Sequence, residues 1–321
     1  MKLKLKVYRG FASDQKLHIS GHVFKKTDPS SFNLERSWLR YAYSMWRTFS
    51  IKTMSNVPVS LNFKGLHSIV YTDANGHFEF KLDHQIKLAP GWHEFTVHIS
   101  ENEEQVTSTG SILKAAEGRG IISDIDDTFL ISHSASIVRK IYILLTRNIN
   151  KRTFFKGVVK HYQQLANVDT PNLQPALFFY VSSSEWNLYN FIEKFATLHS
   201  LPQAVFFLKS IKSGVFDLLS SGGGQHQHKL VSIEYIFNFY PNRAFILLGD
   251  DTQQDPFIYS ALTKKYPHQV VAIYIRQVGK RPKREVQELL LKIEENNILV
   301  CYFENSSIAM EHSRTHGLVE P

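Results

Sequence analysis

The chain has 321 residues, 43% of them hydrophobic and 13% aromatic, which excludes a disordered protein and allows two folded domains. A formal net charge of +8 favours anionic partners, but charge alone does not choose among phosphates, acidic lipid surfaces and nucleic acid. The single cysteine, Cys301, excludes an internal disulfide framework, fits a reducing compartment, and is expected to be an inert core residue because its neighbours are apolar.

Residues 1–115 are predicted to form a β-sandwich domain. The candidate strands, separated by Asp, Asn, Gly and Pro, are Leu3–Tyr8, Lys16–Phe24, Val57–Phe63, His67–Thr72, His77–Leu82 and Trp92–Ile99. Asp73–Gly76 has the composition of a tight turn between paired strands. The first residues alternate lysine with apolar side chains, which is typical of a strand and not of a signal peptide, and no apolar run is long enough to cross a bilayer. We therefore expect a cytoplasmic protein.

One amphipathic helix is predicted inside this domain, from Ser31 to Lys52. Apolar residues that include Trp38 and Trp46 recur at helical spacing, and arginines take the opposite side. Such a face can lie in a membrane interface, but more often it packs on the protein itself.

Residues 116–321 are predicted to form an α/β domain with a Rossmann-like, mainly parallel sheet, after a linker near Lys114–Gly120. Strands alternate with helical patterns in this part of the chain. The first predicted strand ends at Ile121-Ile122. The others span Ala176–Val181, Ala204–Leu208, Ala244–Leu248, Val270–Ile275 and Ile298–Phe303. The predicted helices are Ile137–Thr146, Phe154–Leu165, Trp186–Leu198, Gln225–Phe239 and Lys283–Glu295.

The first of these strands leads into a dense group of polar side chains: Asp124, Asp126, Asp127 and Thr128. Asp124 and Asp126 are two residues apart, so an extended backbone directs both to the same side. The carboxyl end of a strand in an open α/β sheet is where ligands bind. The alternative is a solvated acidic turn, which is the usual meaning of Asp-rich clusters between strands.

Other strand or helix ends carry further apt groups: Ser182, Lys229 and Asp250. Carboxylates from two strand ends can share a divalent cation, and all-oxygen ligands favour Mg²⁺. A lysine balances remaining negative charge, and a hydroxyl beside backbone N–H groups holds phosphate oxygens. Together they suit phosphoryl transfer, which depends on positioning and charge more than on elaborate acid–base chemistry.

In this order the groups resemble the four motifs of haloacid-dehalogenase-type (HAD-like) phosphatases, beginning with the DxDxT motif at Asp124–Thr128. Within that superfamily the chain is similar to the fungal actin-patch-associated phosphatidate phosphatases and their bacterial relatives. The residues that carry this likeness are Ser123–Thr128, Tyr180–Trp186, His228-Lys229, Gly249–Tyr259, Ile273–Arg276 and Glu311–Leu318. The resemblance extends over nearly the whole chain.

The resemblance implies a role for each motif residue. Asp124 is the nucleophile that forms an aspartyl-phosphate, Asp126 is the acid and then the base, and Thr128 steadies Asp126. The phosphate-binding residues are Ser182, Ser183, His228 and Lys229. The Mg²⁺ ligands are Asp124, the carbonyl of Asp126 and Asp250, with Asp255 in support.

The implied activity is Mg²⁺-dependent hydrolysis of phosphatidate to diacylglycerol, by a protein peripheral to an anionic membrane and with no nucleic-acid partner. Four basic residues after the first motif, Arg147, Lys151, Arg152 and Lys156, are candidates to face that membrane. Two alternatives stay open: a phosphatase of another phosphomonoester, and an idle lipid- or protein-binding module. The intact set Asp124, Asp126, Ser182, Lys229 and Asp250 counts against idleness.

Two departures from the family pattern bear on the site. Asp251 stands where serine is common, and it either adds to the metal shell or faces solvent. His226 and His228 suggest a zinc pair, but without cysteine or a nearby carboxylate they are too few for a structural site, and His228 is expected to line the phosphate pocket.

Overall fold

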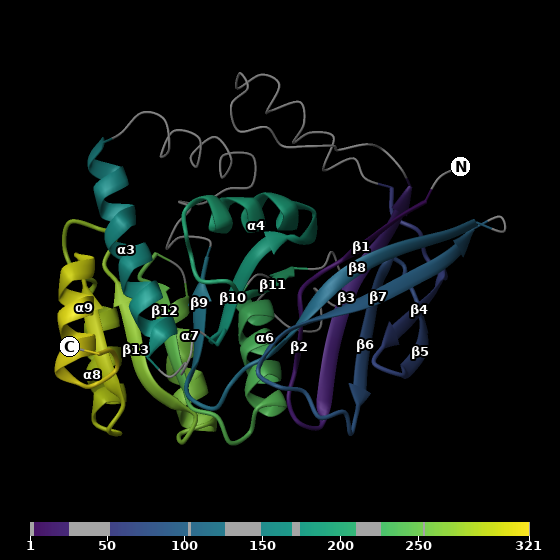
Figure 1. The fold of residues 1–321 in the computed structure, drawn as a ribbon. Helices are drawn as coiled ribbons and strands as arrows, with labels where there is room; N and C mark the ends of the chain where they lie inside the picture. The colour runs from purple at the N-terminus through teal and green to yellow at the C-terminus, as the bar shows by residue number, and fades with distance from the viewer. Residues whose placement is uncertain are drawn as a thin grey trace. The chain divides into compact units, whose positions relative to one another are not determined.

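The computed structural model describes residues 3–25, 52–101, 104–125, 149–168, 174–209, 226–252 and 254–320. These residues form two compact units (Figure 1). The β unit contains the described residues up to Ala115 together with Glu185–Lys194, and the α/β unit contains those of Ala116–Ser184, Phe195–Lys209 and the chain from His226 onward. The predicted helices Ser31–Lys52 and Ile137–Thr146 lie outside the described residues.

The β unit is built on one hydrogen-bonded sheet. Its strands are β1 (Leu3–Val7), β2 (Gly10–Ala12), β3 (Lys16–Lys25), β4 (Pro58–Phe63), β5 (Leu66–Tyr71), β6 (His77–Asp83), β7 (Gly91–Glu101) and β8 (Glu104–Lys114). The order is β1-β3-β2-β8-β7-β4-β5, with β6 paired to β3. All pairs are antiparallel except β2 with β8. A single sheet leaves the finer prediction of a two-sheet sandwich unconfirmed.

Period-two burial explains the strands that the sequence revealed. In β6, Phe78 and Phe80 enter the core while His77 and Glu79 are only partly buried. The turn at Asp73–Gly76 forms, with the Gly76 N–H donating to the Asp73 carbonyl over 2.9 Å. Its flanking strands do not pair with each other, however, because β5 pairs with β4 and β6 pairs with β3.

The segment directly after Ser184 packs inside the β unit. The ring of Trp186 stacks on His22 with centroids 3.9 Å apart, and Tyr8 and His22 share a 2.8 Å hydrogen bond. The backbone N–H of Arg9 donates to the Tyr189 hydroxyl over 3.0 Å. The chain therefore leaves the parallel sheet directly after the serine motif and returns to the α/β unit at Phe195.

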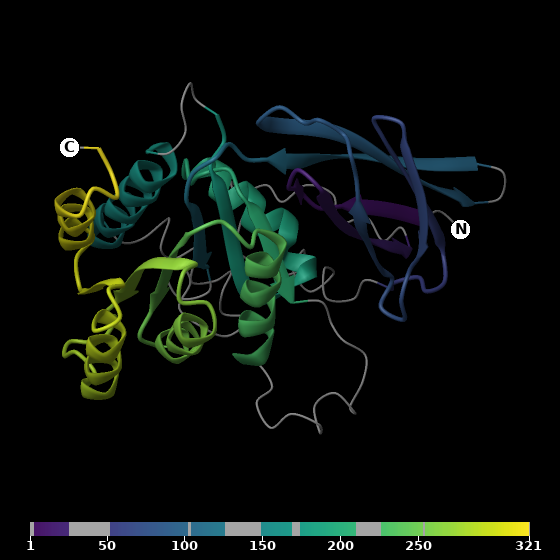
Figure 2. The same cartoon turned by 90° about the horizontal axis from the view of Figure 1, so that it is seen from below.

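The α/β unit has a six-stranded, all-parallel sheet in the order β11-β10-β9-β12-β13-β14. The strands are β9 (Gly120–Asp124), β10 (Leu177–Glu185), β11 (Val205–Lys209), β12 (Phe245–Asp250), β13 (Val270–Arg276) and β14 (Leu299–Phe303). The helices of this part of the chain are α3 (Ile149–Asn167), η2 (Trp186–Leu188), α4 (Tyr189–Leu198), α6 (His226–Phe239), α7 (Asp255–Lys265), α8 (Arg284–Glu294) and α9 (Ser306–Thr315). Figure 2 shows α3 and α9 on one face of the sheet and α6, α7 and α8 on the other.

The α/β class with a parallel sheet is confirmed, and the predicted strands after residue 116 all form. Cover by helices on both faces explains why β9, β10 and β12 are nearly continuous apolar runs. Helices α7 and α9 were not predicted. Within the described ranges, none of the helices combines the length and apolar character that a bilayer crossing requires.

A buried hydrogen-bonded cluster joins α9 to α3 and β13. The Ser313 hydroxyl, which is fully buried, lies 2.8 Å from His161 Nε2 and 2.7 Å from the Tyr274 hydroxyl. The Tyr274 hydroxyl also lies 3.0 Å from His312 Nδ1. Burial lowers the pKa of His161 to about 3, and His312 acts in the same direction. Folded His161 is therefore neutral at pH values where unfolded histidine takes up a proton.

His161→Gln should make stability less sensitive to acid. A depressed histidine pKa stabilises the fold above pH 6.5 and loses that contribution as the pH falls toward 3. Between pH 7 and pH 5 the wild type should therefore lose about 2 kcal/mol of unfolding free energy that the variant keeps. Urea unfolding of both proteins at the two pH values measures this difference. If the wild type and the variant lose the same unfolding free energy between pH 7 and pH 5, His161 takes up its proton in the folded protein.

Candidate active site

The predicted carboxylates meet where the strand order of the parallel sheet reverses. From β9 the chain proceeds outward through β10 and β11, and from β12 it proceeds the opposite way through β13 and β14. β9 and β12 are neighbours, with Leu248 paired to Ser123, and they end in Asp124 and Asp250. In open α/β sheets this reversal point forms a crevice in which ligands bind.

Lys229 forms ion pairs with residues at the end of β9 and at the start of α7, both of which lie at this point. It lies in the first turn of α6, and its side chain is almost fully buried. Its Nζ atom is 2.9 Å from Asp124 Oδ1 and 2.7 Å from Asp255 Oδ1. An ammonium that loses its water must be compensated by such partners, so Lys229 is held in place by charge on two sides.

Asp255 is the first residue of α7, and both of its oxygens are engaged. Oδ1 accepts from Lys229, and Oδ2 accepts from the Asp250 N–H over 3.3 Å. Burial raises the pKa of the Asp255 carboxyl well above its usual value; the charges of Asp124 and Asp250 act in the same direction, and Lys229 opposes them. Gly249 allows this approach, because a Cβ there would stand 2.6 Å from Asp255 Oδ2.

Thr252 is a site residue that the sequence interpretation missed. Its backbone N–H and its hydroxyl each donate to Asp250 Oδ1 over 2.7 Å. This local turn fixes the Asp250 carboxylate at the end of β12. An aspartate followed two residues later by a threonine, directly after a buried strand, was the available signal.

The serine motif lies on the other side of β9. Val181 is in register with Asp124, so Ser182 follows at the next position of the neighbouring strand β10. Ser182 is fully buried, and its Oγ accepts from the Ser184 N–H over 2.9 Å. The serine hydroxyl therefore caps a backbone turn at the same edge of the sheet as Asp124.

The main chain of Asp124 is supported from α3. The Ser123 hydroxyl donates to the Asp124 carbonyl over 2.8 Å, and the Tyr162 hydroxyl lies 2.9 Å from Ser123 Oγ. All three residues are buried. The position of the predicted nucleophile is thus fixed by its own strand, β9, and by the helix α3, which covers one face of the sheet.

Arg276 brings a second buried cation to this edge. It ends β13 in register with Asp250, and its side chain is 3% exposed. Burial lowers the pKa of Arg276 to about 10, while Tyr162 and Asp250 act in the opposite direction. Arg276 is among the residues that carry the family resemblance, which implies no role for it.

Asp251 does not face solvent, which corrects one of the two expectations for it. It is 1% exposed, its Oδ1 accepts from the Val278 N–H over 3.0 Å, and its Oδ2 accepts from the Tyr302 hydroxyl over 2.7 Å. Lys283 Nζ donates to its carbonyl. Adjacent residues of a strand end point to opposite sides, so Asp251 binds the β13–α8 loop while Asp250 faces the site.

Part of the predicted site lies outside the described residues, namely Asp126, Asp127 and Thr128. The same holds for Arg147, and the side chains of Lys151, Arg152, Lys156 and His226 are likewise not described. His228 and Ser183 are partly buried. Among the residues that are described, no three His, Cys, Asp or Glu side chains are grouped as a metal centre.

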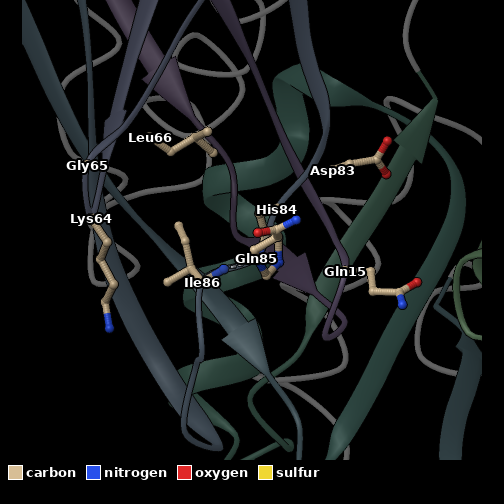
Figure 3. A pocket seen from close by; sticks show the side chains of 8 residues that line it. All are labelled: Gln15, Lys64, Gly65, Leu66, Asp83, His84, Gln85 and Ile86. Carbon is tan, nitrogen blue, oxygen red and sulfur yellow. Dashed lines mark hydrogen bonds between the residues drawn. The ribbon is translucent and has the colours of Figure 1, made fainter.

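The β unit contains a separate hollow of about 680 Å³ (Figure 3). Its lining residues are Gln15, Lys64, Gly65, Leu66, Asp83, His84, Gln85 and Ile86. None of the predicted site residues lines this hollow, so it does not add to the carboxylate–lysine centre.

Together, the parallel sheet and the centre at its reversal point define an α/β protein with a buried carboxylate–lysine site. Residues 119–277, close to half of the chain, match the family model described as phosphatidate phosphatase APP1, catalytic domain. This part of the chain is similar to that family. The match contains all of the predicted site residues.

Two curated proteins are similar to this chain. The phosphatidate phosphatase APP1 of Saccharomyces cerevisiae is 29% identical over 165 residues, which are 50% of this chain and 26% of the relative. An uncharacterized protein of Schizosaccharomyces pombe is 25% identical over 185 residues, which are 54% of this chain and 29% of the relative. The chain therefore spans between a quarter and a third of the length of these relatives.

The solved structures offer only distant likenesses. A carbohydrate acetylesterase from Xanthomonas citri aligns with 94% of this chain and 68% of its own, at 10% identity and a TM-score of 0.32. Such a score carries no argument about fold or function.

Proposed function

We propose that this chain is a phosphatidate phosphatase that hydrolyses the phosphomonoester through an aspartyl-phosphate. The observation that carries the proposal is the ion pair between Lys229 and Asp124 at the reversal point of the sheet, inside the matched family region. A buried lysine beside an aspartate at a strand end suits a nucleophile that must approach a charged phosphate. The proposal includes a HAD-like fold for residues 116–321 and a separate β domain for residues 1–115.

In the proposed first step, an oxygen of Asp124 attacks phosphorus and the bond to the glycerol oxygen breaks. Asp126 gives its proton to the departing alkoxide, so diacylglycerol leaves neutral. Thr128 steadies Asp126. Ser182, Ser183, His228 and Lys229 bind the phosphoryl oxygens, and Lys229 stays paired with Asp124 throughout.

In the second step, Asp126 takes a proton from water, which attacks the aspartyl-phosphate. The bond between phosphorus and the Asp124 oxygen breaks, releasing inorganic phosphate and restoring the carboxylate. Lys229 offsets the negative charge that returns to Asp124. One buried ammonium therefore serves both half-reactions.

The residues present fit a magnesium ion. Asp124 and Asp250 offer hard oxygen ligands from neighbouring strand ends, with the Asp126 carbonyl proposed as a third. Burial raises the pKa of Asp255, and the nearby charges of Asp124 and Asp250 act in the same direction. A bound Mg²⁺ would supply charge neutralisation for the phosphoryl group. Asp255 would support these ligands indirectly, because it accepts hydrogen bonds from Lys229 and from the Asp250 N–H.

Phosphate release should occur from phosphatidate in mixed micelles, stop with EDTA and return with added Mg²⁺. A panel of soluble phosphate esters, assayed in parallel, separates the substrate classes. Asp250→Asn is the matched inactive control because it keeps the side-chain shape while removing a ligand charge.

Higher rates on a soluble ester would favour the alternative of another phosphomonoesterase. A folded protein that releases phosphate from none of these substrates would favour the idle binding module. Undiminished activity after thorough chelation would contradict the magnesium proposal alone.

A further inference from the structure

The loop between β13 and α8 is strongly basic and exposed. Four cations occur within five residues, Lys280, Arg281, Lys283 and Arg284, and no acidic residue lies between Arg276 and Glu285. Residues 278–285 are exposed, and Val278 leaves 40% of its surface in contact with water. A positive and partly apolar loop of this kind is a candidate binding surface.

The place of this loop follows from the sheet topology alone. β13 is parallel to β9 and β12, so its carboxyl end lies at the same edge as Asp124 and Asp250. The loop begins at the next residue after Arg276, which is in register with Asp250. The basic loop and the carboxylate–lysine centre therefore share one edge of one unit.

Asp251 fixes both ends of the loop. Its carboxylate receives the Val278 N–H at the start, and its carbonyl receives Lys283 Nζ near the end. The Tyr302 hydroxyl donates to Asp251 Oδ2 and accepts the backbone N–H of Lys283 over 3.1 Å. Because Asp251 directly follows Asp250, the loop is anchored one residue from the site.

The cations of the loop differ in their partners. Arg284, at the end of the loop, pairs with Glu288, and two exposed cations elsewhere in the unit, Lys265 and Arg314, pair with Glu234 and Glu311. In the described part of the chain, Lys280 and Arg281 have no such ion pair. Their charge is available to an external anion.

We propose that this loop docks the enzyme on an anionic lipid surface, with Lys280 and Arg281 at the headgroups and Val278 against the acyl boundary. The inference rests on the proposed function, because a phosphatidate phosphatase must reach a phosphate that lies in a membrane. Phosphatidate and other acidic lipids supply the complementary charge. Docking through this loop places the carboxyl edge of the sheet toward its substrate.

The test compares Lys280→Ala/Arg281→Ala with Lys264→Ala/Lys292→Ala in the full chain. Both double variants lose two exposed positive charges. Lys264 and Lys292 lie near the ends of α7 and α8, at the opposite edge of the sheet, because each helix starts at the carboxyl edge and returns to the other. Net charge is thus matched and only position differs.

Sedimentation with phosphatidylserine vesicles measures binding without turnover. Each cation near an anionic membrane contributes about fivefold in partitioning, so the loop variant should bind about 25-fold more weakly than wild type. The control variant should stay within about threefold, since its charges lie away from the docking edge. Equal losses in both variants, or vesicle binding that the loop variant retains, would overturn the proposal, as would loop-dependent binding to RNA with none to vesicles.

Activity separates this inference from the proposed function. The loop variant should lose rate on phosphatidate vesicles at low lipid concentration and keep wild-type rate on a soluble ester. Loop-dependent vesicle binding in a protein that hydrolyses no phosphatidate would support the docking proposal and contradict the proposed phosphatidate phosphatase activity. Wild-type phosphatidate hydrolysis with loop-independent vesicle binding would do the reverse.

Discussion

Asp124→Asn should lower phosphate release from phosphatidate by about a thousandfold or more while leaving the protein folded. The amide oxygen is neutral and a poor nucleophile, so no aspartyl-phosphate can form. The isosteric side chain keeps its place at the end of β9, and its oxygen can still accept from Lys229. Initial rates give the loss, and thermal unfolding of the same samples reports on the fold.

Asp251→Asn is the matched control for this change. It makes the same substitution at another buried aspartate, directly after the strand that neighbours β9, at a position that binds the β13–α8 loop. On a soluble ester it should stay within about tenfold of wild type, because the Asp251 carboxylate does not face the site. A greater loss, or a raised Mg²⁺ requirement, would return Asp251 to the metal shell.

The sequence predicted which side chains meet at the reversal point of the sheet better than it predicted the residues that support them. Asp124, Ser182 and Asp250 each follow a long apolar run. Because such a run is buried on both faces of the sheet, the first polar residue after it lies at or near the end of the strand. Parallel pairing then brings those ends together without further information. Lys229 was predictable from its place in the first turn of a helix.

The sequence did not predict the hydrogen bonds between residues of different strands and helices. The bonds from Ser123 to Tyr162 and from Asp251 to Tyr302 join residues 39 and 51 positions apart, and no local pattern reports them. The solvent-facing alternative for Asp251 was wrong for this reason: its polarity suggested a solvated residue, whereas its partners come from later elements of the chain.

Missed elements have a similar cause. β8 alternates Ser, Thr and Gly with few large apolar side chains, so its sequence has a weak strand signal; its pairing with β7 along eleven positions determines the strand. In α9, small and polar residues dominate, and its stability comes from the Ser313 cluster and from packing on β14.

Lys229→Met should be the most damaging single change to stability in the α/β unit. The ammonium lies between two buried carboxylates, and its loss leaves them facing each other without compensation. Removing one partner of a buried ion pair costs about 3–5 kcal/mol of unfolding free energy. Activity should fall with it, since the nucleophile and the phosphoryl group both lose their cation.

Lys265→Met is the matched control in denaturant unfolding. Lys265 also makes a 2.7 Å ion pair, with Glu234, but that pair is exposed to water and salt, so no measurable change is expected. Equal destabilisation by the two substitutions would mean that the burial of Lys229 is not what matters.

A double substitution identifies the source of the damage. In Lys229→Met/Asp255→Asn the second change removes one of the uncompensated carboxylates, whose pKa is already raised by burial and by its acidic neighbours. The pair should therefore be more stable than Lys229→Met alone, with a coupling of about 1–3 kcal/mol, although Asp255→Asn by itself should destabilise the wild type. Strictly additive effects would show that Lys229 does not act through Asp255. Rescue of stability without rescue of phosphate release would be expected as well, because Asp124 would still lack the cation that prepares it for attack on a charged ester.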